Sequence, residues 1–131
     1  PSFSPHRQGE LYLNCDMSEV FHSTDFGKRW STVDFRQLGS VVFSPVAYTS
    51  DKNVLYALQN GVNGRRRPAR STDGGSHWTV LPSDPTGGVS YALLADPHAV
   101  QRVLLAGTLA YVNAGTPNFR DCVEAVGWAQ A

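Results

Sequence analysis

The sequence lacks an excess of charge of either sign, and it lacks long hydrophobic runs. Its 131 residues carry 11 lysines and arginines against 11 aspartates and glutamates, so the formal net charge is zero. Nucleic acids and anionic membranes attract cationic surfaces, which this composition does not supply. No apolar run reaches the roughly 18 residues of a membrane-spanning helix. We therefore expect neither nucleic-acid binding nor membrane insertion.

Cysteine is also scarce, with only Cys15 and Cys122 at distant positions. Neither these cysteines nor the four histidines have the spacing of metal ligands. Two buried thiols are one interpretation of the cysteines, and a long-range disulfide formed in an oxidising compartment is the other. Phosphate-binding loops and dinucleotide fingerprints are absent as well. The sequence therefore predicts no metal and no cofactor.

The informative feature that is present is an internal repeat. The octet STDFGKRW at residues 23–30 recurs as STDGGSHW at residues 71–78, and both fit the pattern S-T-D-x-G-x-x-W. A second element at residues 4–13 recurs at residues 96–105, with its central copy at residues 51–58. Three copies of a unit of about 45–49 residues therefore cross the chain, which is a period typical of repeat architectures such as propellers.

The composition of each unit predicts short β-strands. Runs of β-branched and aromatic residues alternate with clusters of Gly, Asn, Asp and Ser. The runs lie at residues 11–13, 20–21 and 30–35 in the first unit, and at 41–43, 46–48, 54–58, 68–71 and 78–81 in the second. About four strands per unit is the content of one propeller blade. The tail at residues 121–131 is expected to form a turn or two of helix.

These patterns predict an all-β fold made of β-propeller blades of four antiparallel strands. Residues 1–131 are expected to form one partial propeller of about two to three blades. Its divisions are a blade lacking most of its first strand (1–39), a complete blade (40–86) and a degenerate or incomplete blade (87–131). Because closed propellers have about four to eight blades, we expect further blades of a larger propeller or self-association to complete it.

The repeated octet resembles the Asp box, the bacterial-neuraminidase-type (BNR) repeat of sialidases and related propellers. An Asp in such a turn accepts hydrogen bonds from backbone N–H groups, the Gly supplies a positive φ, and the Trp buries its ring between sheets. The resemblance implies that the box joins the third and fourth strands of a blade, on the face away from the ligand site. The residues expected to be structural are Ser23, Asp25, Gly27, Trp30, Ser71, Asp73, Gly75 and Trp78. A third copy at residues 118–128 lacks the Gly, and it is either an eroded box or a coincidence.

Residues 11–25 resemble the strand-turn-strand of xyloglucan-degrading Asp-box glycoside hydrolases, whose pattern is roughly D-x-G-G-x-Y-x-S-x-D. The resemblance implies that Asp16 is a catalytic acid or base, whereas a structural turn role is the alternative. Ser18 and Glu19 depart from the pattern, because they stand where two glycines are expected. Glycoside hydrolysis also needs a second carboxylate about 5–9.5 Å away, and the chain offers no second match.

Four arginines cluster near the middle of the chain, and they raise the alternative of a sialidase-type site that binds a substrate carboxylate. The Gly- and Asn-rich segment at residues 60–68 contains Arg65, Arg66 and Arg67, and Arg70 follows it. Adjacent arginines on one loop point in different directions and do not converge on one anion. We therefore expect a solvated loop here.

Two functions of different classes remain open. The first is a segment of a carbohydrate-active, glycoside hydrolase-like propeller that is extracellular or periplasmic and binds an oligosaccharide. The second is a non-catalytic propeller that binds proteins or peptides, as in sortilin-type receptors or assembly factors. Both classes contain the octet, so the octet does not distinguish them.

Overall fold

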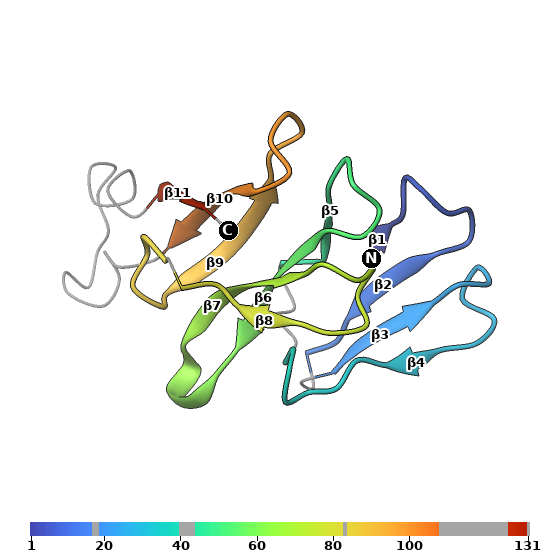
Figure 1. Cartoon of the computed structure of the whole chain (residues 1–131). Helices are drawn as coiled ribbons and strands as arrows, with labels where there is room; N and C mark the ends of the chain where they lie inside the picture. Colours follow the sequence, from blue (N-terminus) through green and yellow to red (C-terminus); the bar gives the residue numbers. More distant parts are fainter. Residues whose placement is uncertain (17–18, 40–43, 83, 108–125, 131) are drawn as a thin grey trace.

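The computed structural model describes residues 1–16, 19–39, 44–82, 84–107 and 126–130. The strands form three antiparallel sheets that follow one another along the chain and lie side by side (Figure 1). The first sheet has the order β1-β2-β3-β4, with β1 (Ser2–Phe3), β2 (Leu11–Asn14), β3 (Val20–Ser23) and β4 (Ser31–Thr32). The second has the order β5-β6-β7-β8, with β5 (Ala47–Tyr48), β6 (Leu55–Asn60), β7 (Arg66–Ser71) and β8 (Thr79–Val80).

The third sheet contains three described strands in the order β11-β10-β9. They are β9 (Ser90–Ala95), β10 (Arg102–Gly107) and β11 (Val126–Gln130). A short 3-10 helix, η1 (Val62–Gly64), lies between β6 and β7. The predicted fold class is confirmed: the described chain is all-β, and two of its sheets have four antiparallel strands joined in sequence order.

Several predicted element boundaries are wrong. The strand expected at residues 30–35 is only Ser31–Thr32, and the one at 78–81 is only Thr79–Val80. Both are outer strands, which pair on one side only, so few residues satisfy the regular pairing. The expected helical tail is also wrong over 126–130, because these residues pair with β10 through Arg102–Ala106. Residues 41–43 and the third octet copy up to residue 125 lie outside the described residues.

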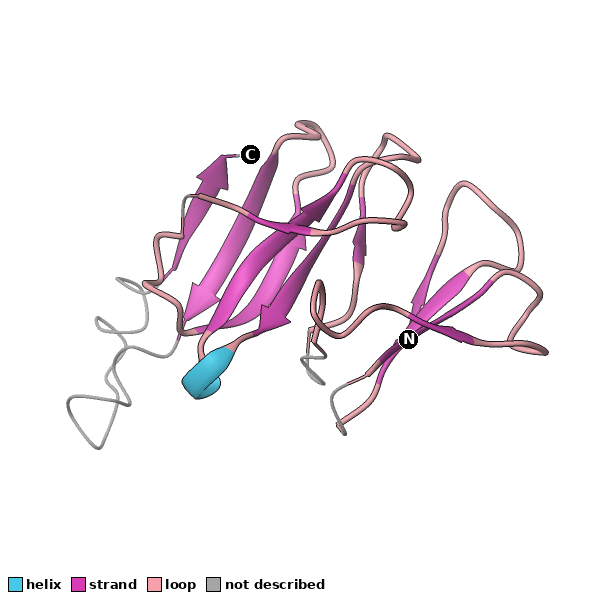
Figure 2. Cartoon of the chain, turned by 60° about the horizontal axis from the view of Figure 1, so that its bottom comes forward, coloured by secondary structure: helices cyan, strands magenta, loops and turns pink. Residues whose placement is uncertain are grey.

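The core consists of two apolar layers, one between each pair of neighbouring sheets. Strand β6 shows the reason, because its consecutive residues alternate between the two layers. Leu55 and Ala57 pack in the layer shared with the first sheet, whereas Tyr56 and Leu58 pack in the layer shared with the third. A period of two with both faces buried is expected of a sheet enclosed between two others. Figure 2 shows the second and third sheets side by side.

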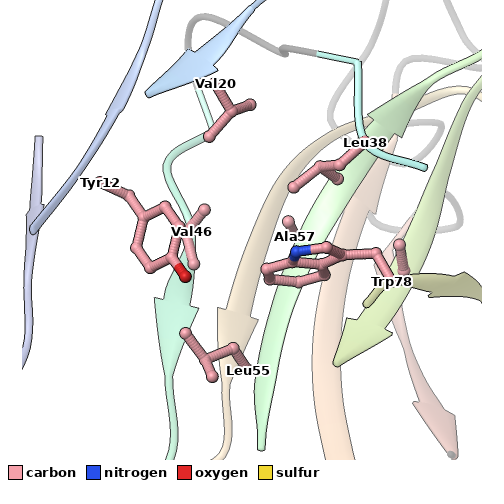
Figure 3. Packing of buried hydrophobic residues seen from close by; sticks show 8 residues of the cluster. Tyr12, Val20, Leu38, Val46, Leu55, Ala57 and Trp78 are labelled. Atoms are coloured by element: carbon pink, nitrogen blue, oxygen red, sulfur yellow. The ribbon is translucent and has the colours of Figure 1, made fainter. Parts of the chain in front are cut away.

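The layer between the first two sheets contains the buried rings of Tyr12 and Trp78. Tyr12 and Val20 of the first sheet meet Leu55 and Trp78 of the second across it (Figure 3). We call the face that a sheet turns toward the previous sheet its upstream face, and the opposite one its downstream face. Tyr12 therefore lies on the downstream face of the first sheet, and Trp78 packs on the upstream face of the second.

Candidate functional site

The two octets form the turns between β3 and β4 and between β7 and β8, and a buried serine organises each turn. The Ser23 Oγ accepts a hydrogen bond from the Gly27 backbone N–H at 2.9 Å and donates one to Asp25 Oδ1 at 3.0 Å. In the second turn, the Ser71 Oγ accepts from the Gly75 N–H at 2.9 Å and donates to Asp73 Oδ1 at 2.8 Å. The repeated residues thus make the same contacts twice.

The aspartate of each octet closes its turn by binding the residue four positions later. Asp25 accepts from the backbone N–H and from the Nε–H of Arg29, at 2.9 and 2.8 Å. Asp73 Oδ1 lies 2.9 Å from the backbone N of His77, whose ring Nδ1 lies 2.6 Å from Asp73 Oδ2. Hydrogen bonds from these side chains and then from the backbone N–H groups lower the pKa of each carboxyl to about 2. Both carboxylates are therefore ionised at neutral pH and engaged within their own turns.

The two tryptophans of the octets differ, and this corrects one prediction. Trp78 is buried at 4% exposure between the first and second sheets, and its Nε1–H donates to the Gly75 carbonyl at 3.1 Å. Trp30 is 42% exposed, so its ring is not buried between described sheets. The reason is its position, because its ring lies over Gly27 and the apolar layer of the first sheet is on the sheet's other face.

A groove of about 250 Å³ lies where the second octet turn approaches the first sheet. Its wall includes Tyr12 and His22, whose rings stack at 4.3 Å between centroids. The His22 Nε2 lies 3.0 Å from Glu10 Oε1. Burial, followed by the charges of Glu10 and Asp73, raises the pKa of Tyr12. At Gly75 a Cβ atom would lie 2.0 Å from the Tyr12 hydroxyl oxygen, so the turn fits the first sheet only with glycine there.

Sequence reasoning did not find the cluster of Glu10, Tyr12 and His22. Tyr12 belongs to β2 and His22 to β3, and Glu10 lies just before β2. Cross-strand pairing places Tyr12 directly opposite His22. The alternation of residues along β2 and β3 indicates that Tyr12 and His22 share a face of the first sheet. It does not indicate that the second octet turn packs against Tyr12. The contact with Gly75 depends on how the two sheets pack.

Asp16 lies at the opposite end of the first sheet from the octet, because antiparallel turns alternate between the two ends. It directly follows β2 in an exposed turn, and its Oδ1 lies 3.6 Å from the Cys15 Sγ. Asp34 and Asp84 follow the outer strands β4 and β8. Asp34 is paired with Arg36 at 2.8 Å, and Asp84 accepts hydrogen bonds from Thr86 and Gly88 within its own loop. Asp34 and Asp84 are thus each engaged within their own loops.

The arginine cluster does not lie in a loop as expected. Arg66, Arg67 and Arg70 are part of strand β7, and only Arg65 belongs to the turn. The reason is that β6 and β7 pair as far as Asn60 opposite Arg66, which leaves a five-residue turn. Consecutive strand residues point to opposite faces, so Arg67 points to the face opposite that of Arg66 and Arg70.

Two observations concern metals and membranes, and both apply only to the residues that the structure describes. No group of three or more His, Cys, Asp or Glu side chains is placed to hold a metal ion there. No helix in that part of the chain is long and apolar enough to cross a membrane. Cys15 is half-buried, and Cys122 lies outside the described residues.

The class of fold is that of a partial β-propeller, in which successive antiparallel sheets pack face to face as blades. No protein-family model matches the sequence. The chain is similar to a probable oligoxyloglucan-reducing end-specific xyloglucanase of Neosartorya fischeri, with 30% identity over 113 residues. That similarity covers 80% of this chain and 14% of the relative, so the chain spans about one seventh of the relative's length.

Solved structures of glycoside hydrolase family 74 (GH74) share the fold. An ancestral GH74 enzyme matches with a TM-score of 0.62 and 18% identity, over 86% of this chain and 14% of that protein. The GH74 xyloglucanase from Xanthomonas campestris matches with a TM-score of 0.60 and 18% identity, over 98% and 20%. The GH74 enzyme of Niastella koreensis gives 0.55 and 21%, over 80% and 16%. At these identities the likeness concerns the fold.

Proposed function

We propose that this chain is a segment of the propeller of a secreted glycoside hydrolase that acts on xyloglucan-type oligosaccharides. The observation that carries the proposal is the 30% identity to a probable xyloglucanase over most of this chain. In this proposal residues 23–30 and 71–78 are Asp boxes, and residues 1–39, 40–86 and 87–131 belong to three successive blades. Export to an extracellular or periplasmic space is part of the same proposal.

Asp16 is the proposed catalytic acid or base of this chain. Its support is its place in the turn between β2 and β3, at the end of the sheet opposite the octet turn. Its carboxylate is exposed to solvent, whereas Asp25 is held by the serine and arginine of its turn. Because hydrolysis needs two carboxylates, the second one comes from outside the described residues in this proposal.

The test is Asp16→Asn in the protein at its full natural length, with release of reducing ends from xyloglucan oligosaccharides as the assay. Asn keeps the size of the side chain but neither donates nor accepts a proton as an acid or base. We expect kcat to fall by about 10²–10⁴, the usual contribution of general acid–base catalysis, with little change in thermal stability.

The matched control is Asp51→Asn, which removes another exposed carboxylate, in the turn between β5 and β6. Its Oδ1 accepts from the Asn53 N–H, and an amide oxygen keeps that bond. We expect this variant to hydrolyse at the wild-type rate. An undiminished rate in Asp16→Asn would remove Asp16 from the chemistry. A wild-type protein that neither binds nor cleaves these oligosaccharides would refute the proposed activity.

A further inference from the structure

The groove between the first sheet and the second octet turn has three side chains in one row along one of its walls. Cross-strand pairing places Tyr12 opposite His22, and His22 opposite Ser31. Residues that are paired in this way share a face of the sheet, so all three side chains lie on its downstream face. The turn at residues 74–76 forms the facing wall. Both walls thus belong to the described part of this chain, within the contact between its first two sheets.

The hydroxyl of Tyr12 has no hydrogen-bond partner among the described residues. The side chain is only 1% exposed, and its oxygen lies close to Gly75 in the facing wall. The strand register makes Tyr56 the equivalent residue of the second sheet, and the Tyr56 hydroxyl donates to the Val100 carbonyl at 2.7 Å. Because buried tyrosine hydroxyls ordinarily have a partner, the unpaired hydroxyl of Tyr12 indicates that a ligand in the groove supplies one.

Further hydroxyl groups surround the same groove. Besides Tyr12, the described lining includes Ser31, Thr32 and Ser76. Each hydroxyl donates one hydrogen bond and also accepts, so this lining matches a ligand whose own groups do both. The hydroxyl groups of a sugar have this property.

The charges near the groove favour a neutral ligand. None of the described residues that line it is a lysine or an arginine. The carboxylates of Glu10 and Asp73, which help to raise the pKa of Tyr12, would repel an anion. The carboxylate in the described lining is that of Asp34, and its pairing with Arg36 at 2.8 Å weakens its attraction for a cation.

The size of the groove limits the ligand to a single ring. Its volume of about 250 Å³ is below the roughly 300–1,000 Å³ of pockets that hold drug-sized molecules. We propose that the groove binds one neutral sugar ring, whose hydroxyl groups form hydrogen bonds with Tyr12 and with the serine and threonine hydroxyls around it. The second octet turn forms one wall of this site, whereas Asp16 lies at the other end of the first sheet. The inference does not rest on the proposed hydrolase activity.

The test is a ligand-observed NMR titration of glucose and of xylose against the protein at its full natural length. We expect Kd values in the millimolar range, as is usual for a small ligand held by a few hydrogen bonds. Tyr12→Phe removes only the hydroxyl and should raise Kd about three- to tenfold, the usual effect of losing one hydrogen bond. Glucuronate, which differs from glucose by one carboxylate, should bind at least about tenfold more weakly than glucose.

Ser31→Phe fills the groove with a ring and should raise the Kd for both sugars at least about tenfold. The matched control is Thr79→Phe, at the equivalent position of the second sheet. Ser31 Oγ donates to the His22 carbonyl at 3.3 Å, just as Thr79 Oγ1 donates to the Arg70 carbonyl at 3.4 Å. The control should bind like the wild type, and thermal melts check that each variant is folded. Failure of the wild-type protein to bind either sugar would overturn the proposal. Binding that Ser31→Phe or Tyr12→Phe leaves unchanged would assign the sugar to another site and would overturn it too.

Discussion

Replacing Gly75 with alanine is the sharpest perturbation of the contact between the first two sheets. Gly75 has φ +95°, a conformation that costs an L-residue about 1–2 kcal/mol. The new Cβ would also lie 2.0 Å from the Tyr12 hydroxyl oxygen, so the turn or the ring must move. Overpacking of this kind costs about 1–3 kcal/mol, which brings the expected loss in the free energy of unfolding to about 2–5 kcal/mol.

The assay is urea unfolding followed by tryptophan fluorescence, with Gly87→Ala as the control. Gly87 has φ +67° and no heavy atom within 4 Å of a built Cβ, so its substitution should cost only the conformational term of about 1–2 kcal/mol. Tyr12→Phe in the Gly75→Ala background removes the clashing oxygen and should recover part of the loss. Equal losses at the two glycines, with no recovery from Tyr12→Phe, would refute the packing explanation.

The remaining predictions use the same unfolding assay or thermal melts. Trp78→Ala should cost about 3–5 kcal/mol because its ring is buried, whereas Trp30→Ala should cost less than half as much; equal losses would contradict the assignment of the two rings. Asp73 has a folded-state pKa of about 2, below its usual 3.8, so its ionised form stabilises the fold above about pH 4. That contribution is lost as the pH falls through 2, so the Tm difference between wild type and Asp73→Asn should shrink from pH 4 to pH 2. A difference that stays constant over this range would show that the carboxylate does not act through its charge.

The fold class could be predicted because the repeat and the β-rich composition are local properties of the sequence. The two octets share the pattern S-T-D-x-G-x-x-W, and each serine and aspartate binds atoms within its own turn. Strand ends were predicted less well at β4 and β8. The length of each of these outer strands is set by how many of its residues pair with one neighbouring strand, and only two do so in each case. Likewise, Arg66 belongs to a strand because β6 extends far enough to pair with it.

The candidate site could be predicted only in part. The resemblance pointed to Asp16, and the structure places it in an exposed turn away from the octets. No property of the sequence predicted that Tyr12 would stack on His22 and press against Gly75. These contacts join residues from strands and turns that are distant in sequence, so they depend on the packing of one sheet on another.

The sequence by itself determined the repeat, the strands and the hydrogen bonds that close each octet turn. Local hydrogen bonds and the period-two alternation are sufficient for these features. The tertiary structure alone decided which of two equivalent tryptophans is buried. Trp78 has the first sheet against it, whereas Trp30 lies on the upstream face of that sheet and remains exposed. The burial of a side chain depends on what packs against it, and the shared octet pattern carries no information about the neighbouring sheet.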